Sequence, residues 1–140
     1  MLKKILVATD GSDHARKAIE YACDIASKYN AMIYLIHVVN LPSWVYSEDS
    51  FEPVKDHIRK AGKEIIEQAE KKIREKGAKS VQTFLTKGDA ADEILQYGEE
   101  NNVDMIILGS RGASGVKTLL LGSVSHKVCS LADCTCVTVK

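Results

Sequence analysis

The chain has 140 residues, carries 19 basic and 19 acidic side chains, and is 45% hydrophobic. A chain of this length buries roughly 70% of the surface that its unfolded form exposes, so residues 1–140 can form a single domain without a disulfide or a metal. A formal net charge of zero argues against a nucleic-acid partner, because binding to a phosphate backbone requires concentrated Lys and Arg. No stretch approaches the ~20 apolar residues of a membrane-spanning helix.

Apolar periodicity alternates between short continuous runs, typical of buried strands, and helical spacing. In chain order, the pattern predicts a strand at 4–9, a helix capped by Ser12 or Asp13, a strand at 31–39, a loop at 40–52, a helix at 53–76, a strand at 81–86, a helix starting near Asp89, a strand at 103–108, a glycine-rich segment at 109–122, a helix at 123–131 and a strand at 135–139. The longest helix should bury a line of five residues: Ile58, Ala61, Ile65, Ala69 and Ile73.

Strands that alternate with helices indicate a parallel sheet, because parallel neighbours need a crossover connection and a helix supplies it. We therefore predict a doubly wound α/β fold, an open five-stranded sheet with helices on both faces. In this fold, ligands bind beyond the carboxyl ends of the strands where the strand order reverses. The loops after the first and fourth strands, residues 9–12 and 109–122, are thus the first candidates for a site.

The glycine-rich segment before the last helix suits an anion. Glycines let the backbone approach a ligand, and we expect free N–H groups at Gly122, Ser123 and Val124 to present partial positive charge to a phosphate. Ser123 and Ser125 add hydroxyl donors. The simpler alternative is that the glycines only turn the chain and that Ser123 caps the helix.

Two familiar phosphate loops fit this chain less well. A Walker loop needs a lysine directly after its last glycine, and Gly115-Val116-Lys117 misses that spacing by one residue. The dinucleotide pattern G-x-G-x-x-G is absent after the first strand. Asp10 stands there instead, where its carboxylate can accept hydrogen bonds from a ribose, approach a phosphate-bound Mg²⁺, or simply form a turn that caps the first helix.

The spacing Gly109-x2-Gly112-x9-Gly122-Ser123, together with residues 4–12 and 35–39, resembles the universal stress protein family over essentially the whole chain. This resemblance implies the strand order 3-2-1-4-5. For the branch with the glycine motif it implies binding of ATP or another adenine nucleotide, and it leaves open a bound Mg²⁺ or Mn²⁺ ion. The implied function is that of a nucleotide-dependent regulator or sensor in a stress response.

The resemblance also assigns binding roles by position. It assigns the ribose to Asp10, the adenine edge to the backbone of Val38, and the phosphates to the glycines and the start of the last helix. The predicted binding residues are Thr9, Asp10, Val38, Gly109, Ser110, Arg111, Gly112, Gly122, Ser123, Val124 and Ser125. No catalytic or metal-binding residue is predicted.

The resemblance further implies a homodimer paired through the last strand, from Val137 to Val139. Relatives usually carry a proline before this strand, whereas this chain has Asp133-Cys134-Thr135-Cys136. We therefore leave open that the strand edge used for dimer pairing differs from that of the relatives. Because the cysteines lie in apolar segments and residues 1–8 run into a charged turn instead of a signal-peptide cleavage site, we expect buried, reduced thiols in a cytoplasmic protein. A disulfide, or zinc held by His126 and the nearby cysteines, is the weaker alternative.

Several side chains keep two interpretations. Arg111 and Lys117 either neutralise phosphate or are solvated. Trp44 and Tyr46 either cover an adenine ring as a lid, or hold a long loop in place or contact another subunit. Of the scattered histidines, His37 is expected to pack inside. Two other functions stay open, a slow ATP-hydrolysing enzyme of this fold and a dimeric interaction module without a nucleotide.

Overall fold

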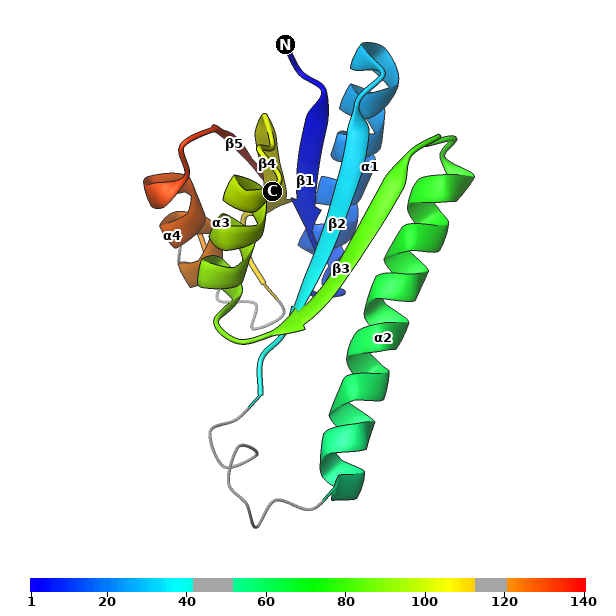
Figure 1. Ribbon diagram of the computed structural model, residues 1–140, viewed down its shortest axis with the longest axis vertical. Coiled ribbons are helices and arrows are strands. Elements are labelled where there is room, and N and C mark those ends of the chain that lie inside the picture. Colours follow the sequence, from blue (N-terminus) through cyan, green and yellow to red (C-terminus); the bar gives the residue numbers. More distant parts are fainter. Residues whose placement is uncertain (42–51, 113–120) are drawn as a thin grey trace.

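The computed structural model describes residues 1–41, 52–112 and 121–140. In chain order it contains β1 (Lys4–Ala8), α1 (Asp13–Tyr29), β2 (Met32–Val39), α2 (Glu52–Glu75), β3 (Val81–Lys87), α3 (Ala90–Glu100), β4 (Met105–Gly109), α4 (Ser123–Leu131) and β5 (Thr135–Val139). The strands form a five-stranded parallel sheet in the order β3-β2-β1-β4-β5 (Figure 1). The predicted fold class and strand order are both confirmed.

The central strands contribute to two separate cores, because successive residues of a strand point to opposite faces of the sheet. Ile5 and Val7 of β1 pack in a cluster with α1 and α2, whereas Leu6 packs in a cluster with α3 and α4. All three side chains are 0% exposed. Burial on both faces explains why β1, β2 and β4 are continuous apolar runs instead of alternating ones.

The buried line of α2 agrees with the prediction at Ala69 and Ile73. Ile58 and Ile65 are only half-buried, and Ile66 is buried instead of Ile65. The structure buries Gly62 where the pattern predicts Ala61, which is exposed. A Cβ added to Gly62 would lie 2.7 Å from Cγ2 of Val39, so a glycine is needed for α2 to pack this closely on β2. Apolar periodicity cannot reveal such a position, because glycine adds no hydrophobic side chain to the pattern.

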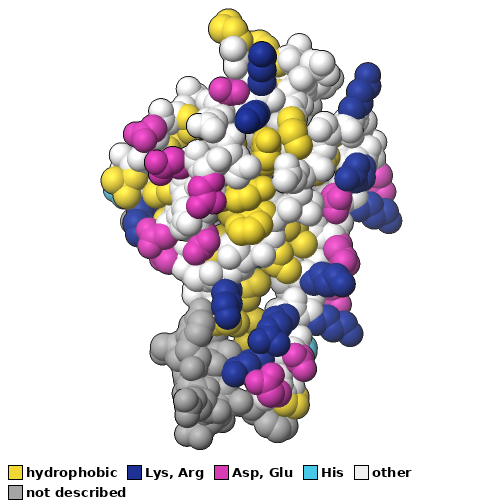
Figure 2. Space-filling view, viewed as in Figure 1, with side chains coloured by type: hydrophobic (Ala, Val, Ile, Leu, Met, Phe, Trp, Pro, Cys, Tyr) yellow, Lys and Arg dark blue, Asp and Glu magenta, His cyan; other side chains and the backbone are white. Residues whose placement is uncertain are grey.

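The outer face of α2 is covered by charged side chains of alternating sign (Figure 2). Three ion pairs at i, i+4 spacing lie along it: Lys63–Glu67 at 3.8 Å, Lys71–Glu75 at 3.9 Å and Arg74–Glu70 at 3.0 Å. Exposed pairs of this kind contribute a few tenths of a kcal/mol each, so this surface mainly keeps the helix solvated. Of the helices in the described ranges, none has the length and apolar character that crossing a membrane requires.

Candidate functional site

A pocket of about 250 Å³ opens at the carboxyl ends of β1, β2 and β4, where the strand order reverses. Ten of the eleven predicted binding residues line it: Thr9, Asp10, Val38, Gly109, Arg111, Gly112, Gly122, Ser123, Val124 and Ser125. The exception is Ser110, which is 1% exposed and lies beneath the pocket wall. Segments about 100 residues apart in the sequence thus meet as the doubly wound topology predicts.

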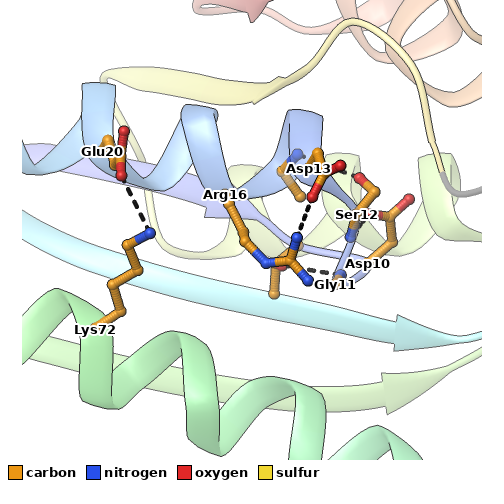
Figure 3. Close-up of polar contacts among 9 residues, drawn as sticks. Asp10, Gly11, Ser12, Asp13, Arg16, Glu20 and Lys72 are labelled. Carbon is orange, nitrogen blue, oxygen red and sulfur yellow. Dashed lines mark hydrogen bonds and ion pairs between the residues drawn. The ribbon is translucent and has the colours of Figure 1, made fainter.

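Side-chain hydrogen bonds between residues close in sequence fix the turn after β1 (Figure 3). The Ser12 N–H donates to Oδ1 of Asp10 at 2.9 Å, and the Ala15 N–H donates to Oγ of Ser12 at 3.2 Å. Ser12 is therefore the cap of α1, and the alternative that Asp10 caps this helix is wrong. Asp10 is exposed at the strand tip, with one carboxylate oxygen holding the turn.

Two glycines let the β4 connection approach this turn. A Cβ added to Gly109 would lie 2.8 Å from the backbone carbon of His14, and a Cβ added to Gly112 would lie 3.0 Å from Oδ2 of Asp10. Both separations are shorter than ordinary van der Waals contact. A larger residue at Gly109 would push β4 away from the start of α1, whereas at Gly112 it would displace the Asp10 carboxylate by a few tenths of an ångström. The glycines bring Asp10 into the same pocket as the β4 loop.

The start of α4 has no side-chain cap. Its N-cap residue is Gly122, which makes no side-chain capping bond, and the first intrahelical bond runs from the His126 N–H to the Gly122 oxygen at 3.0 Å. The N–H groups of Ser123, Val124 and Ser125 precede that bond and have no partner within the helix. All three residues line the pocket, so the positive end of the helix dipole faces it.

Two of the predicted phosphate donors are engaged with the protein itself. The Gly122 N–H donates to the Ser110 oxygen at 2.6 Å, so the prediction that this N–H is free is wrong. The Ser125 hydroxyl lies 2.9 Å from the Ser110 oxygen and 3.1 Å from the Gly122 oxygen, and the residue is 2% exposed. Its proton binds backbone carbonyls, which makes Ser125 a structural support. Ser123 is exposed and follows the cap, so the alternative that Ser123 caps the helix is also wrong.

Charged side chains hold the starts of α3 and α4 together. Nζ of Lys127 lies 2.8 Å from Oδ1 of Asp92 and 3.6 Å from Oδ2 of Asp89, and these carboxylates raise the pKa of the lysine. Asp89 also caps α3 by accepting the Asp92 N–H at 3.0 Å, and this backbone hydrogen bond is the main cause of its lowered pKa. Ala90 and Ile94 of α3 line the pocket.

The structure also identifies pocket residues that sequence reasoning missed. They are the small and apolar residues Ala8, Ala15, Ile36, Ala90, Ile94 and Leu108. The sequence could have identified three of them, because Ala8, Ile36 and Leu108 all lie near the carboxyl end of a predicted strand. Trp44, Tyr46 and Lys117, whose proposed roles are tied to the pocket, lie outside the described residues.

The cysteines near β5 lie away from this pocket. All four cysteines are free thiols, and Sγ of Cys136 lies 3.7 Å from the Cys134 oxygen. Burial raises the pKa of Cys136 to about 12, and the neighbouring Cys129 and Cys134 add to the shift. The Cys136 thiol is thus protonated at neutral pH. Among the side chains that the structure describes, no group of three or more His, Cys, Asp or Glu is arranged to hold a metal ion.

Comparison with known proteins agrees with the fold and with the predicted family. The sequence model of the universal stress protein family matches residues 1–140. Universal stress protein YxiE of Bacillus subtilis (strain 168) is 38% identical, with 100% of both chains covered. The solved structure of MJ0577 from Methanocaldococcus jannaschii matches with a TM-score of 0.89 at 28% identity, over 100% of this chain and 96% of that chain. A universal stress protein in complex with cAMP matches with a TM-score of 0.77 at 26% identity, over 99% and 97% of the two chains. The chain therefore belongs to the universal stress protein family.

Proposed function

We propose that this protein binds ATP in the pocket at the carboxyl ends of β1, β2 and β4 and acts as a nucleotide-dependent regulator or sensor in a stress response. The observation that carries the proposal is the meeting of three groups in one pocket. They are the Asp10 carboxylate, the Val38 backbone and the uncapped start of α4. Each suits a different part of a nucleotide.

The base would lie against the apolar wall formed by Ile36, Ile94 and Leu108, and its polar edge would meet the backbone of Val38. The ribose hydroxyls would donate to the Asp10 carboxylate. A pocket of about 250 Å³ lies just below the roughly 300–1,000 Å³ of common ligand sites, which suits a nucleoside whose phosphates extend toward α4. A universal stress protein of 26% identity is in complex with cAMP, which supports an adenine nucleotide here.

The phosphates would meet the N–H groups of Ser123 and Val124 and the Ser123 hydroxyl. A helix start is a favourable anion site because its unpaired N–H groups and the helix dipole both attract negative charge. Arg111 lines the same pocket and adds a full positive charge. A Mg²⁺ or Mn²⁺ ion would fit this arrangement as a companion of the phosphates, which would supply its oxygen ligands together with water.

Binding without rapid turnover is the favoured activity. Hydrolysis requires a group that positions or activates water beside the terminal phosphate. Among the described residues that line the pocket, Asp10 is the one carboxylate, and none is a histidine. The lining groups can therefore hold a nucleotide more readily than they can activate water.

Equilibrium dialysis with ATP tests the proposal. We expect saturable binding by the wild-type protein and a loss of at least tenfold in Gly122→Val, because a Cβ at this position already lies 3.4 Å from the Arg111 Cα and the Ser110 oxygen. Ser130→Ala is the control on the same helix, since this exposed serine bonds the His126 oxygen far from the pocket. Absence of saturable binding, or equal binding by Gly122→Val, would contradict the proposal.

An assay for ADP release separates binding from slow catalysis. The proposal predicts less than one turnover per chain over hours with Mg²⁺ present. Several turnovers per chain that disappear in Asp10→Ala would instead favour the enzyme. A third possibility, an interaction module without a nucleotide, would show neither ATP binding in dialysis nor ADP release.

A further inference from the structure

The buried imidazole of His37 hydrogen-bonds to the backbone just beyond the end of β1. His37 lies in β2, is 8% exposed, and has its Nδ1 2.7 Å from the backbone oxygen of Thr9. A carbonyl oxygen carries no proton, so Nδ1–H is the donor in this bond. Helix α2 runs close to the ring, since a Cβ built at Gly62 would lie 3.7 Å from its Cδ2. The sequence predicts the burial of His37 correctly but gives no sign of this bond.

This bond stands where the β1–β2 ladder would otherwise continue. The Thr9 N–H donates to the Ile36 oxygen at 2.9 Å, and in a regular parallel pair the Thr9 oxygen would next accept the Val38 N–H. Among the described residues, the backbone hydrogen bonds include no such rung, and the partner of the Thr9 oxygen is the His37 ring. The side chain therefore replaces the backbone at the last position of the ladder.

The consequence is an open backbone edge at Val38. On the other side of β2, the Gly88 N–H donates to the Val39 oxygen at 3.2 Å, so Val39 faces β3. Neighbouring residues in a parallel strand direct their N–H and C=O groups to opposite sides, which places those of Val38 toward the end of β1. Val38 lines the pocket at this point.

We propose that His37 is a positioning residue that ends the β1–β2 ladder at Thr9 and thereby keeps the N–H and C=O of Val38 open to select adenine over guanine. This inference rests on the proposed nucleotide function. The Val38 N–H suits the N1 acceptor of adenine, and its C=O suits the 6-amino donor. Guanine carries a donor at N1 and an acceptor at position 6, so at this edge donor would face donor and acceptor would face acceptor.

The energetics explain how loss of the imidazole would act. A buried carbonyl without a donor costs about 1–3 kcal/mol, so without the imidazole the Thr9 oxygen would favour another N–H donor. The Val38 N–H is the donor that one more rung of the parallel ladder would supply. Pairing it would close the edge that the base requires, while the start of α4 would remain able to hold phosphate.

Two amide variants form a matched pair, because they place a similar polar group at different positions. His37→Asn sets its Nδ2 near the place of the imidazole Nδ1 and can donate to Thr9. His37→Gln sets its amide near the place of Nε2 and cannot make the same bond without displacing the chain. We expect His37→Asn to keep ATP affinity within about threefold and His37→Gln to lose at least tenfold.

Calorimetry with ATP, GTP and inorganic tripolyphosphate gives the decisive readout. The inference predicts that His37→Gln loses the preference for ATP over GTP but binds tripolyphosphate as the wild type does, and that His37→Asn restores the preference. Equal losses for all three ligands, or an unchanged preference in His37→Gln, would overturn it. Saturable ATP binding by the wild type without any preference over GTP would overturn the role of His37 alone, whereas absence of ATP binding would overturn the proposed function as well.

Amide hydrogen exchange of the wild-type protein provides a test that does not depend on a variant's folding. The Val38 N–H should exchange rapidly in the free protein, be protected by ATP, and stay unprotected with tripolyphosphate. The Thr9 N–H, which bonds the Ile36 oxygen, is the internal control and should be protected throughout. Strong protection of Val38 in the free protein would contradict the open edge.

Discussion

The starts of α1 and α4 lie at the same edge of the sheet but are built differently. The start of α1 is closed by its own side chains, since Ser12 accepts the Ala15 N–H and Asp10 accepts the Ser12 N–H. The start of α4 has Gly122 as its cap and no side-chain capping bond. Helix α3 resembles α1 in this respect, with Asp89 as a side-chain cap.

The difference predicts separate effects on stability and on nucleotide binding. A capped helix start satisfies its own N–H groups, whereas an uncapped start leaves them available to an external anion. In this protein the uncapped start lines the pocket with three consecutive residues. The comparison predicts that changes at α1 and α3 act on the free energy of unfolding, and that changes at α4 act on nucleotide affinity.

The largest effect is expected at a glycine that joins the two regions. Gly109→Ala would place its Cβ 2.8 Å from the backbone of His14 and force β4 and α1 apart. We expect the free energy of unfolding to fall by about 2–3 kcal/mol, as for other overpacked sites. Gly122→Ala is the matched control, because its Cβ meets its nearest neighbours at 3.4 Å and should cost less than about 1 kcal/mol. Urea denaturation of both variants checks this, and equal costs would contradict the close approach.

A pair of serine variants tests the comparison directly. Ser12→Ala removes the cap of α1 and should lower the free energy of unfolding by about 1 kcal/mol without changing ATP affinity beyond about twofold. Ser123→Ala should leave the free energy of unfolding within about 0.5 kcal/mol and weaken ATP binding about three- to tenfold. Thermal denaturation and calorimetry measure the two quantities. If Ser123→Ala is the more destabilising variant, the assignment of the two helix starts is wrong.

The smallest effect concerns the pH dependence of α3. Bonding to the Asp92 N–H lowers the pKa of Asp89 below its ordinary value of 3.8, so folding favours the ionised carboxylate. The stabilisation should be complete above pH 3.8 and be lost as the pH falls through the lower pKa of the folded state. Asp89→Asn keeps a capping side chain without the charge. Its free energy of unfolding should therefore fall less than that of the wild type between pH 5 and pH 2, by a difference of less than about 1 kcal/mol. Parallel slopes for Asp89→Asn and wild type between pH 5 and pH 2 would contradict the assignment.

The sequence predicts the layout of the fold and the location of the site better than it predicts individual contacts. Continuous apolar strands separated by helices fix the fold class, and the family resemblance supplies the strand order. The spacing of Gly109, Gly112 and Gly122 locates the pocket, because each glycine allows a close backbone approach or a turn. The buried face of α2 is predicted correctly at Ala69 and Ile73, but Ile66 is buried instead of Ile65. Gly62 is buried instead of Ala61, because the close packing there depends on the absence of a side chain.

The remaining contacts could not be predicted because they depend on three-dimensional hydrogen-bond geometry. Nothing in the glycine spacing reveals that the Gly122 N–H donates to Ser110, or that the Ser125 hydroxyl binds two backbone oxygens. The bond from His37 to Thr9 joins residues 28 positions apart and stands in for a backbone rung. Such replacements become visible only when the register of β1 and β2 is known.

The central claim is that one pocket holds the base at Val38, the ribose at Asp10 and the phosphates at the start of α4. Amide chemical shifts recorded during titration with adenosine and then with ATP test it most directly. The account predicts that adenosine shifts the amides of Val38 and Gly11, and that ATP shifts Ser123 and Val124 in addition. If ATP leaves the amides of Ser123 and Val124 unchanged while binding saturably, the claim is contradicted.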